Sequence, residues 1–175
     1  MLKYRRKTLS EAIKCEYYRM EKSYLVTIPV IVLVLAILTR WISGSPITTL
    51  HYIGIRQIVP PTYLMILLFS FFYVVAGLSL GVALGNRFCS CGERKYQGAM
   101  WFCICLSLGY AWYPIFFCAR LFLISLFTCL LSLFAGICAS ICFYRVSSLS
   151  FILALIYNAW LAYLAILNIQ IFFAV

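Results

Sequence analysis

The stretch PTYLMILLFSFFYVVAGLSLGVAL, residues 61–84, runs for 24 positions without a charged residue. An α-helix rises about 1.5 Å per residue, so about 20 apolar residues are enough to cross the hydrocarbon core of a bilayer. The apolar run is continuous rather than alternating, which is typical of a spanning helix and not of a barrel strand. We therefore predict a transmembrane helix over these residues.

Four more stretches of similar character account for most of the remaining chain, at residues 24–41, 98–118, 121–143 and 148–174. The 175 residues are 66% hydrophobic and only 10% charged, which is more apolar surface than a soluble domain of this size can bury. The last two connections are very short, so consecutive helices must be antiparallel neighbours. We predict an all-α, polytopic membrane protein in which residues 24–175 form one five-helix bundle in the lipid bilayer.

The net charge of +10 would suggest a nucleic-acid partner in a soluble protein, but the placement of the charges indicates a membrane topology instead. Eleven Lys and Arg residues lie before the first span and in the second and fourth connections, and only Arg40, Arg56 and Arg120 lie on the other side. The positive-inside rule then predicts a cytoplasmic N-terminus and a C-terminus on the opposite side. Residues 1–23 form a basic cytoplasmic arm, either solvated or folded as a short interfacial helix.

Glycines recur at every fourth position near the end of the second span, at Gly77, Gly81 and Gly85. Residues at this spacing share one helix face, and small side chains there let two helices approach closely in a membrane. The stripe predicts helix packing, either within the bundle or at a dimer seam.

The sequence contains few residues of the kinds that bind metals or act in catalysis. Cys89 and Cys91 form a CxC pair without the CxxC spacing of zinc or redox sites, and the single histidine, His51, lies in a connection. We therefore expect no metal site. The spans contain no Ser/His/Asp set and no acidic residue, which argues against an enzyme and against a transporter coupled to protons or ions.

Several motifs in the last three spans resemble those of the TspO/MBR family, the tryptophan-rich sensory proteins and the mitochondrial translocator protein. They are AWYPIFFCAR at residues 111–120, YRVS at 144–147, YNAWLAY at 157–163 and LN at 167–168. The resemblance extends from about residue 60 to the C-terminus, and the preceding residues match only in hydropathy. Phe69, Tyr63 and Tyr110 stand where the family commonly has tryptophan.

The resemblance implies a five-helix bundle, often a homodimer, that binds porphyrin, haem or another flat hydrophobic molecule in a cavity open towards the first connection. In such a site, aromatic rings would stack on the ligand and a Trp N–H or Tyr O–H would bind its propionate or carbonyl. Carried over by position, the pocket residues come from the second, third and fifth spans: Tyr63, Phe69, Tyr73, Tyr110, Trp112, Trp160 and Asn168. The expected role is sensory, regulatory or tetrapyrrole-handling. The alternatives are a small-molecule transporter, or a packing subunit that acts through protein partners.

Overall fold

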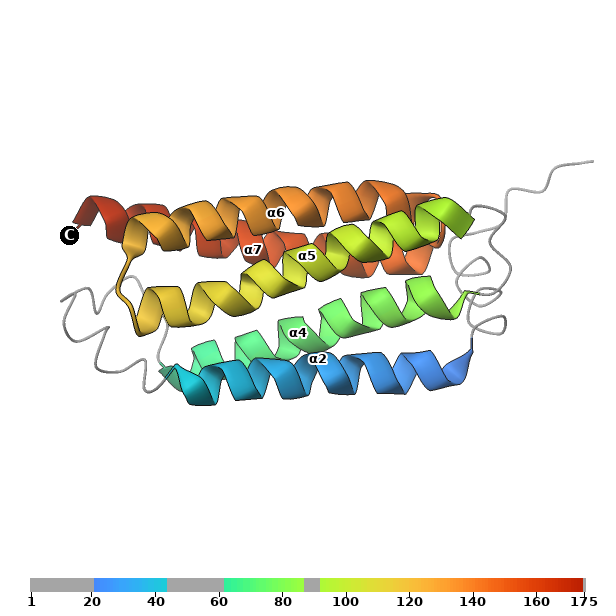
Figure 1. The fold of residues 1–175 in the computed structure, drawn as a ribbon, viewed down its shortest axis with the longest axis horizontal. Helices are drawn as coiled ribbons and strands as arrows, with labels where there is room; N and C mark the ends of the chain where they lie inside the picture. The colour runs from blue at the N-terminus through green and yellow to red at the C-terminus, as the bar shows by residue number, and fades with distance from the viewer. Residues whose placement is uncertain (1–20, 44–61, 87–91, 175) are drawn as a thin grey trace, which may run out of the picture.

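The computed structural model describes residues 21–43, 62–86 and 92–174, which form a bundle of long helices. Successive helices run in opposite directions (Figure 1). Most of the basic arm, together with His51, Cys89 and Cys91, lies outside the described residues. The helices are α2 (Lys22–Ile42), α4 (Thr62–Gly85), α5 (Gly92–Phe117), α6 (Phe122–Tyr144) and α7 (Ser148–Ala174).

The predicted spans agree with these helices except at the start of α5. Hydropathy placed that start at residue 98, but the helix begins at Gly92. The added turns contain Glu93, Arg94 and Lys95, which are too polar for a membrane span but are good helix formers. Glu93 also lies in the first turn, where a negative charge interacts favourably with the helix dipole.

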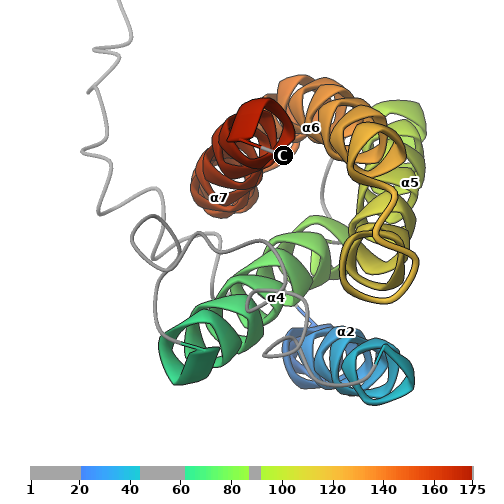
Figure 2. The same cartoon turned by 90° about the vertical axis from the view of Figure 1, so that its left-hand side faces the viewer.

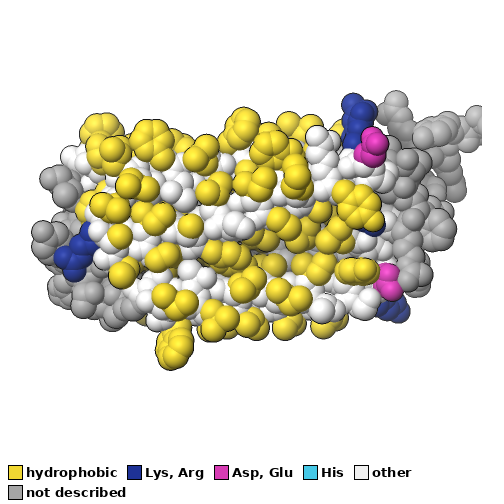
Figure 3. All heavy atoms as spheres, viewed as in Figure 1, with side chains coloured by type: hydrophobic (Ala, Val, Ile, Leu, Met, Phe, Trp, Pro, Cys, Tyr) yellow, Lys and Arg dark blue, Asp and Glu magenta, His cyan; other side chains and the backbone are white. Residues whose placement is uncertain are grey.

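The outer surface of the bundle is apolar along its length. Each of the five helices is long and apolar enough to cross a membrane, and large aliphatic and aromatic side chains on all of them point outwards. On the face shown in Figure 3, charged side chains appear only at the two ends of the bundle. Such a surface is stable only against lipid, and the chain is a multi-pass integral membrane protein.

The helices α5, α6 and α7 form an arc, and α4 completes the bundle beside α7 (Figure 2). The helix α2 packs mainly on the outer side of α4 and touches α5 less extensively. Only 11% of its most apolar stretch is buried, against 39–50% for the other four helices. The first span is therefore a peripheral helix with most of its surface towards lipid.

The glycine stripe of α4 faces α2 of the same chain. A Cβ atom added to Gly81 would lie 2.7 Å from the carbonyl oxygen of Tyr24, and one added to Gly85 would lie 3.3 Å from that of Glu21. Gly77 meets the backbone of Pro29 in the same way. This face is used for packing within the bundle, so α2 would have to move before a second copy could pack there.

Buried hydroxyl groups join the helices at several levels. Ser79 on α4 and Ser150 on α7 exchange hydrogen bonds, each hydroxyl donating to the other residue's carbonyl oxygen at 2.9 and 2.8 Å. The Ser132 hydroxyl on α6 donates to the carbonyl oxygen of Cys105 on α5 at 2.9 Å. In a membrane, such bonds add specificity to packing that has no hydrophobic driving force between helices.

Candidate ligand-binding site

Phe69 lies at the centre of an aromatic cluster inside the bundle. Its ring stacks with Trp112 of α5 at a centroid distance of 5.8 Å and meets Trp160 of α7 edge-on at 5.3 Å. It also meets Tyr113 edge-on at 5.5 Å. Offset and edge-to-face pairs at these distances are favourable arrangements of aromatic rings. The cluster joins α4, α5 and α7 about one side chain.

The polar end of Trp112 is already engaged. Its indole N–H donates to Oδ1 of Asn168 at 3.3 Å, and the Ser125 hydroxyl lies 2.8 Å from the same oxygen. Asn168 in turn donates through Nδ2 to the carbonyl oxygen of Leu164 at 2.7 Å. These groups hold α5, α6 and α7 together, and they are not available to a ligand without breaking those bonds.

Three tyrosines form a second cluster beside the first. The rings of Tyr73 and Tyr110 are stacked, with their centroids 5.0 Å apart, and the ring centroids of Tyr73 and Tyr157 are 6.2 Å apart. The Tyr110 hydroxyl donates to the carbonyl oxygen of Val32 on α2 at 2.8 Å. The Tyr73 hydroxyl is hydrogen-bonded to Tyr157. The hydroxyls of Tyr73 and Tyr110, like the Trp112 N–H, therefore serve contacts between helices.

Three small cavities lie among these rings. One lies between α2, α4 and α5 and has a volume of about 50 Å³. The corresponding volumes are about 10 Å³ between Phe69, Trp112 and Trp160, and about 20 Å³ beside Asn168. Phe69 and Tyr73 belong to the walls of both of the first two cavities. These two rings are therefore the partition between them.

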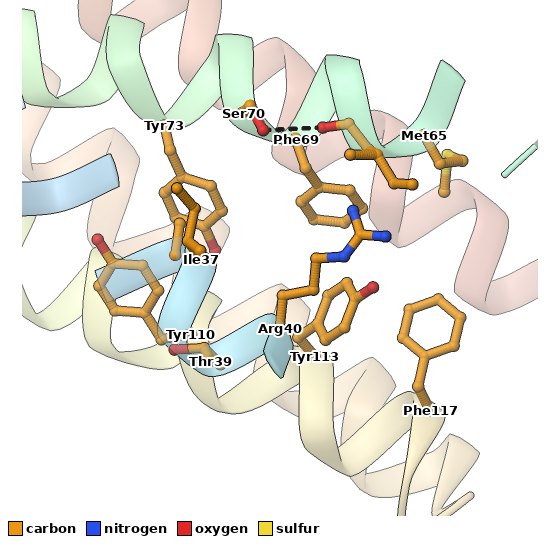
Figure 4. Close-up of a pocket in the computed structure, with 12 residues that line it drawn as sticks. Ile37, Thr39, Arg40, Met65, Phe69, Ser70, Tyr73, Tyr110, Tyr113 and Phe117 are labelled. Carbon is orange, nitrogen blue, oxygen red and sulfur yellow. Dashed lines mark hydrogen bonds between the residues drawn. The ribbon is translucent and has the colours of Figure 1, made fainter. Parts of the chain in front are cut away.

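The cavity between α2, α4 and α5 is the largest of the three, and its mostly apolar wall carries one charged side chain (Figure 4). Its whole empty space, including the part open to the outside, is about 640 Å³. The side chain of Arg40, in the last turn of α2, extends into it beside Tyr113 and Phe69. The remaining lining residues are Ala36, Ile37, Thr39, Met65, Ile66, Ser70, Tyr73, Tyr110 and Phe117.

Comparison with known proteins identifies the family of this chain. A model of the TspO/MBR family matches residues 25–174. The chain belongs to the TspO/MBR family. No curated protein and no solved structure matches it.

The TspO/MBR match includes the first span, whereas the motifs that carry the resemblance begin only near residue 60. It therefore covers α2, the helix that supplies Arg40 and one wall of the largest cavity described above. The family relation thus extends over all five helices.

Tyr63 is the one residue carried over from the TspO/MBR resemblance that does not line these cavities. Its side chain is 73% exposed near the start of α4 and is absent from the walls of the cavities described here. The other six residues carried over from the family do line these cavities: Phe69, Tyr73, Tyr110, Trp112, Trp160 and Asn168.

The space between the second, third and fifth spans is narrower than the hollow that the resemblance implies. Phe69, Trp112 and Trp160 fill most of that space with their own rings, and the cavity of about 50 Å³ lies one helix further round, against α2. The rings meet there because three bulky aromatic side chains project from facing helices into one level of the bundle. Close packing of this kind is the normal state of a protein interior.

Among the lining residues that sequence reasoning missed, Arg40 and Tyr113 carry a guanidinium group and a phenolic hydroxyl. Arg40 was counted only as a positive charge on the side of the membrane opposite the N-terminus, and Tyr113 only as part of a motif. An arginine two residues before the end of an apolar span, in a family with an internal site, was the available signal. It does not say which way the side chain points, because that depends on how α2 is rotated against α4.

Proposed function

We propose that this protein binds a porphyrin, haem or another flat hydrophobic molecule inside the bundle, in a sensory, regulatory or tetrapyrrole-handling role. The observation that supports this most is the aromatic cluster of Phe69, Trp112 and Trp160, which faces inwards from three different helices. Ring faces in this arrangement can exchange stacking on each other for stacking on a flat ligand. Membership of the TspO/MBR family supports the same class of ligand.

The proposal requires the rings to move. Ligand pockets usually measure about 300–1,000 Å³, whereas the three cavities offer about 50, 10 and 20 Å³. Rotation of Phe69 and Tyr73 would join the two cavities that they separate, and would open the joined space towards α2. Binding is then accompanied by rearrangement of side chains, with the helices as the fixed frame.

We also propose a membrane topology. The bias of basic residues supports a cytoplasmic N-terminus and a C-terminus on the opposite side.

A homodimer is also part of the proposal. The glycine stripe of α4 already contacts α2, and the small residues Ala135, Gly136 and Ala139 of α6 are buried inside the bundle. A dimer would therefore use other faces, and a partner-binding role through the glycine stripe loses its main support.

The test is a titration of the purified protein in detergent with protoporphyrin IX, followed by quenching of tryptophan fluorescence. Trp112→Phe and Trp160→Phe should each weaken binding several-fold, because each removes part of the ring surface offered to the ligand. Trp41→Phe is the matched control, since Trp41 is 83% exposed at the end of α2. Unchanged affinity in both cluster variants would contradict the assignment of the pocket, and absence of binding by the wild type would contradict the function.

A further inference from the structure

The wall of the cavity between α2, α4 and α5 contains a positive charge, and no negative charge from the described residues lies beside it. Arg40 is half-buried in its wall, and no acidic side chain among the described residues lies within ion-pair distance of its guanidinium group. The whole chain contains only four acidic residues: Glu11, Glu16, Glu21 and Glu93. Glu21 precedes α2 and Glu93 lies in the first turn of α5, both at the opposite end of the bundle from Arg40. Glu11 and Glu16 lie outside the described residues.

The other polar groups of this wall are mostly satisfied by the backbone. Thr39 donates to the carbonyl oxygen of Leu35, and Ser70 donates to that of Ile66. The Tyr110 hydroxyl donates to Val32, as described above.

The Tyr113 hydroxyl differs from these groups. It has no hydrogen-bond partner in the described part of the chain, and it lies close enough to Arg40 for an electrostatic interaction. A guanidinium group and a free phenolic hydroxyl therefore face the same space.

We propose that Arg40 and Tyr113 bind the carboxylate of an amphiphilic ligand whose apolar body lies against Phe69, Tyr73 and Met65. A guanidinium group can donate two parallel N–H bonds to a carboxylate, and a phenolic hydroxyl can supply a third donor. The surrounding wall is apolar, which strengthens such a bond by excluding water. This inference rests on the proposed function and narrows it, because it selects acids over neutral molecules of the same shape.

Two other roles would also explain an arginine in this position. A basic residue in the last turn of a helix interacts favourably with the helix dipole. An arginine near the end of a span also reaches towards the phosphates of lipid headgroups. Neither role predicts that the bundle distinguishes an acid ligand from its ester.

The experiment compares protoporphyrin IX with its dimethyl ester, which keeps the macrocycle and removes both negative charges. Affinities are measured by tryptophan quenching with the purified full-length protein in non-ionic detergent. The wild type should bind the acid at least about tenfold more tightly than the ester, as expected for loss of a charge-assisted hydrogen bond. Arg40→Gln should reduce the affinity for the acid to that for the ester and leave the ester's affinity unchanged. Tyr113→Phe should reduce the preference in part.

The controls separate this inference from the proposed function. Arg120→Gln removes a positive charge from the same end of the bundle, outside the cavity wall, and should keep the full preference. Equal binding of acid and ester by the wild type would overturn the inference and leave the proposed function standing, whereas binding of neither would overturn both. A preference for the acid that survives in Arg40→Gln would overturn the role of Arg40. Binding of the ester shows that the pocket is intact, so a misfolded variant is recognised because it no longer binds the ester. The comparison of acid and ester in the wild type does not depend on any variant.

Discussion

Gly77 on α4 lies so close to Pro29 on α2 that a Cβ atom added to the glycine would be 2.5 Å from the proline Cα. The contact is between two backbones, so no flexible side chain can move aside to relieve it. The same proline is one of only two buried residues of α2. The attachment of the peripheral first span to the rest of the bundle therefore depends on the absence of a side chain at residue 77.

Gly77→Ala should destabilise the protein by about 1–3 kcal/mol, the usual cost of an overpacked contact, even though alanine is the better helix former. Thermal unfolding in detergent, followed by circular dichroism, measures this. Gly92→Ala is the matched control, because a Cβ atom there meets nothing within 4 Å. Equal midpoints for the two variants would show that α2 does not pack on α4 at this level.

Ser79→Ala should cost about 1 kcal/mol, because the substitution removes one of the two hydrogen bonds that join α4 and α7. Ser70→Ala on the same helix should be nearly neutral, since that hydroxyl bonds only to its own helix. The double variant Ser79→Ala/Ser150→Ala should cost less than the sum of the single variants if the two residues act as a pair. Additive losses would show that they are independent.

Asn168→Leu should destabilise the protein by about 1–3 kcal/mol, because it leaves the buried N–H of Trp112 without its acceptor. Trp112→Phe removes that N–H, and should therefore be less damaging in the Asn168→Leu background than in the wild type. Trp101→Phe should cost the same in both backgrounds, since Trp101 is not part of this network. A double-mutant cycle on unfolding free energies gives the coupling, and a value near zero would contradict the bond.

Phe69→Ala should speed the association of protoporphyrin IX, because the ring that separates the two cavities would no longer have to move. The substitution should also cost up to about 3 kcal/mol of stability, since it removes contacts with Trp112, Tyr113 and Trp160. Stopped-flow quenching measures the rate, and Phe71→Ala, at a residue that is 54% exposed, is the control. An unchanged rate would show that Phe69 does not limit entry.

Much of the candidate site could be predicted from the sequence. Motifs and family resemblance identified Phe69, Tyr73 and Trp112 among the residues that line the cavities. Tyr63 lies outside the walls of these cavities, because a position in a family pattern does not fix the direction of a side chain near the first turn of a helix. Arg40 was missed because its role depends on contacts with residues of α4 and α5, which are distant in the chain.

The sequence by itself determined the five spans, since a lipid environment requires each apolar segment to satisfy its own backbone hydrogen bonds. That requirement is local, and it can be recognised in hydropathy alone. Only the tertiary structure decided that the glycine stripe faces α2, that Trp112 is bonded to Asn168, and that a cavity lies beside Arg40. These features depend on the rotation and lateral order of the helices, which are set by the packing of side chains from distant segments and leave no trace in the apolar character of any one span.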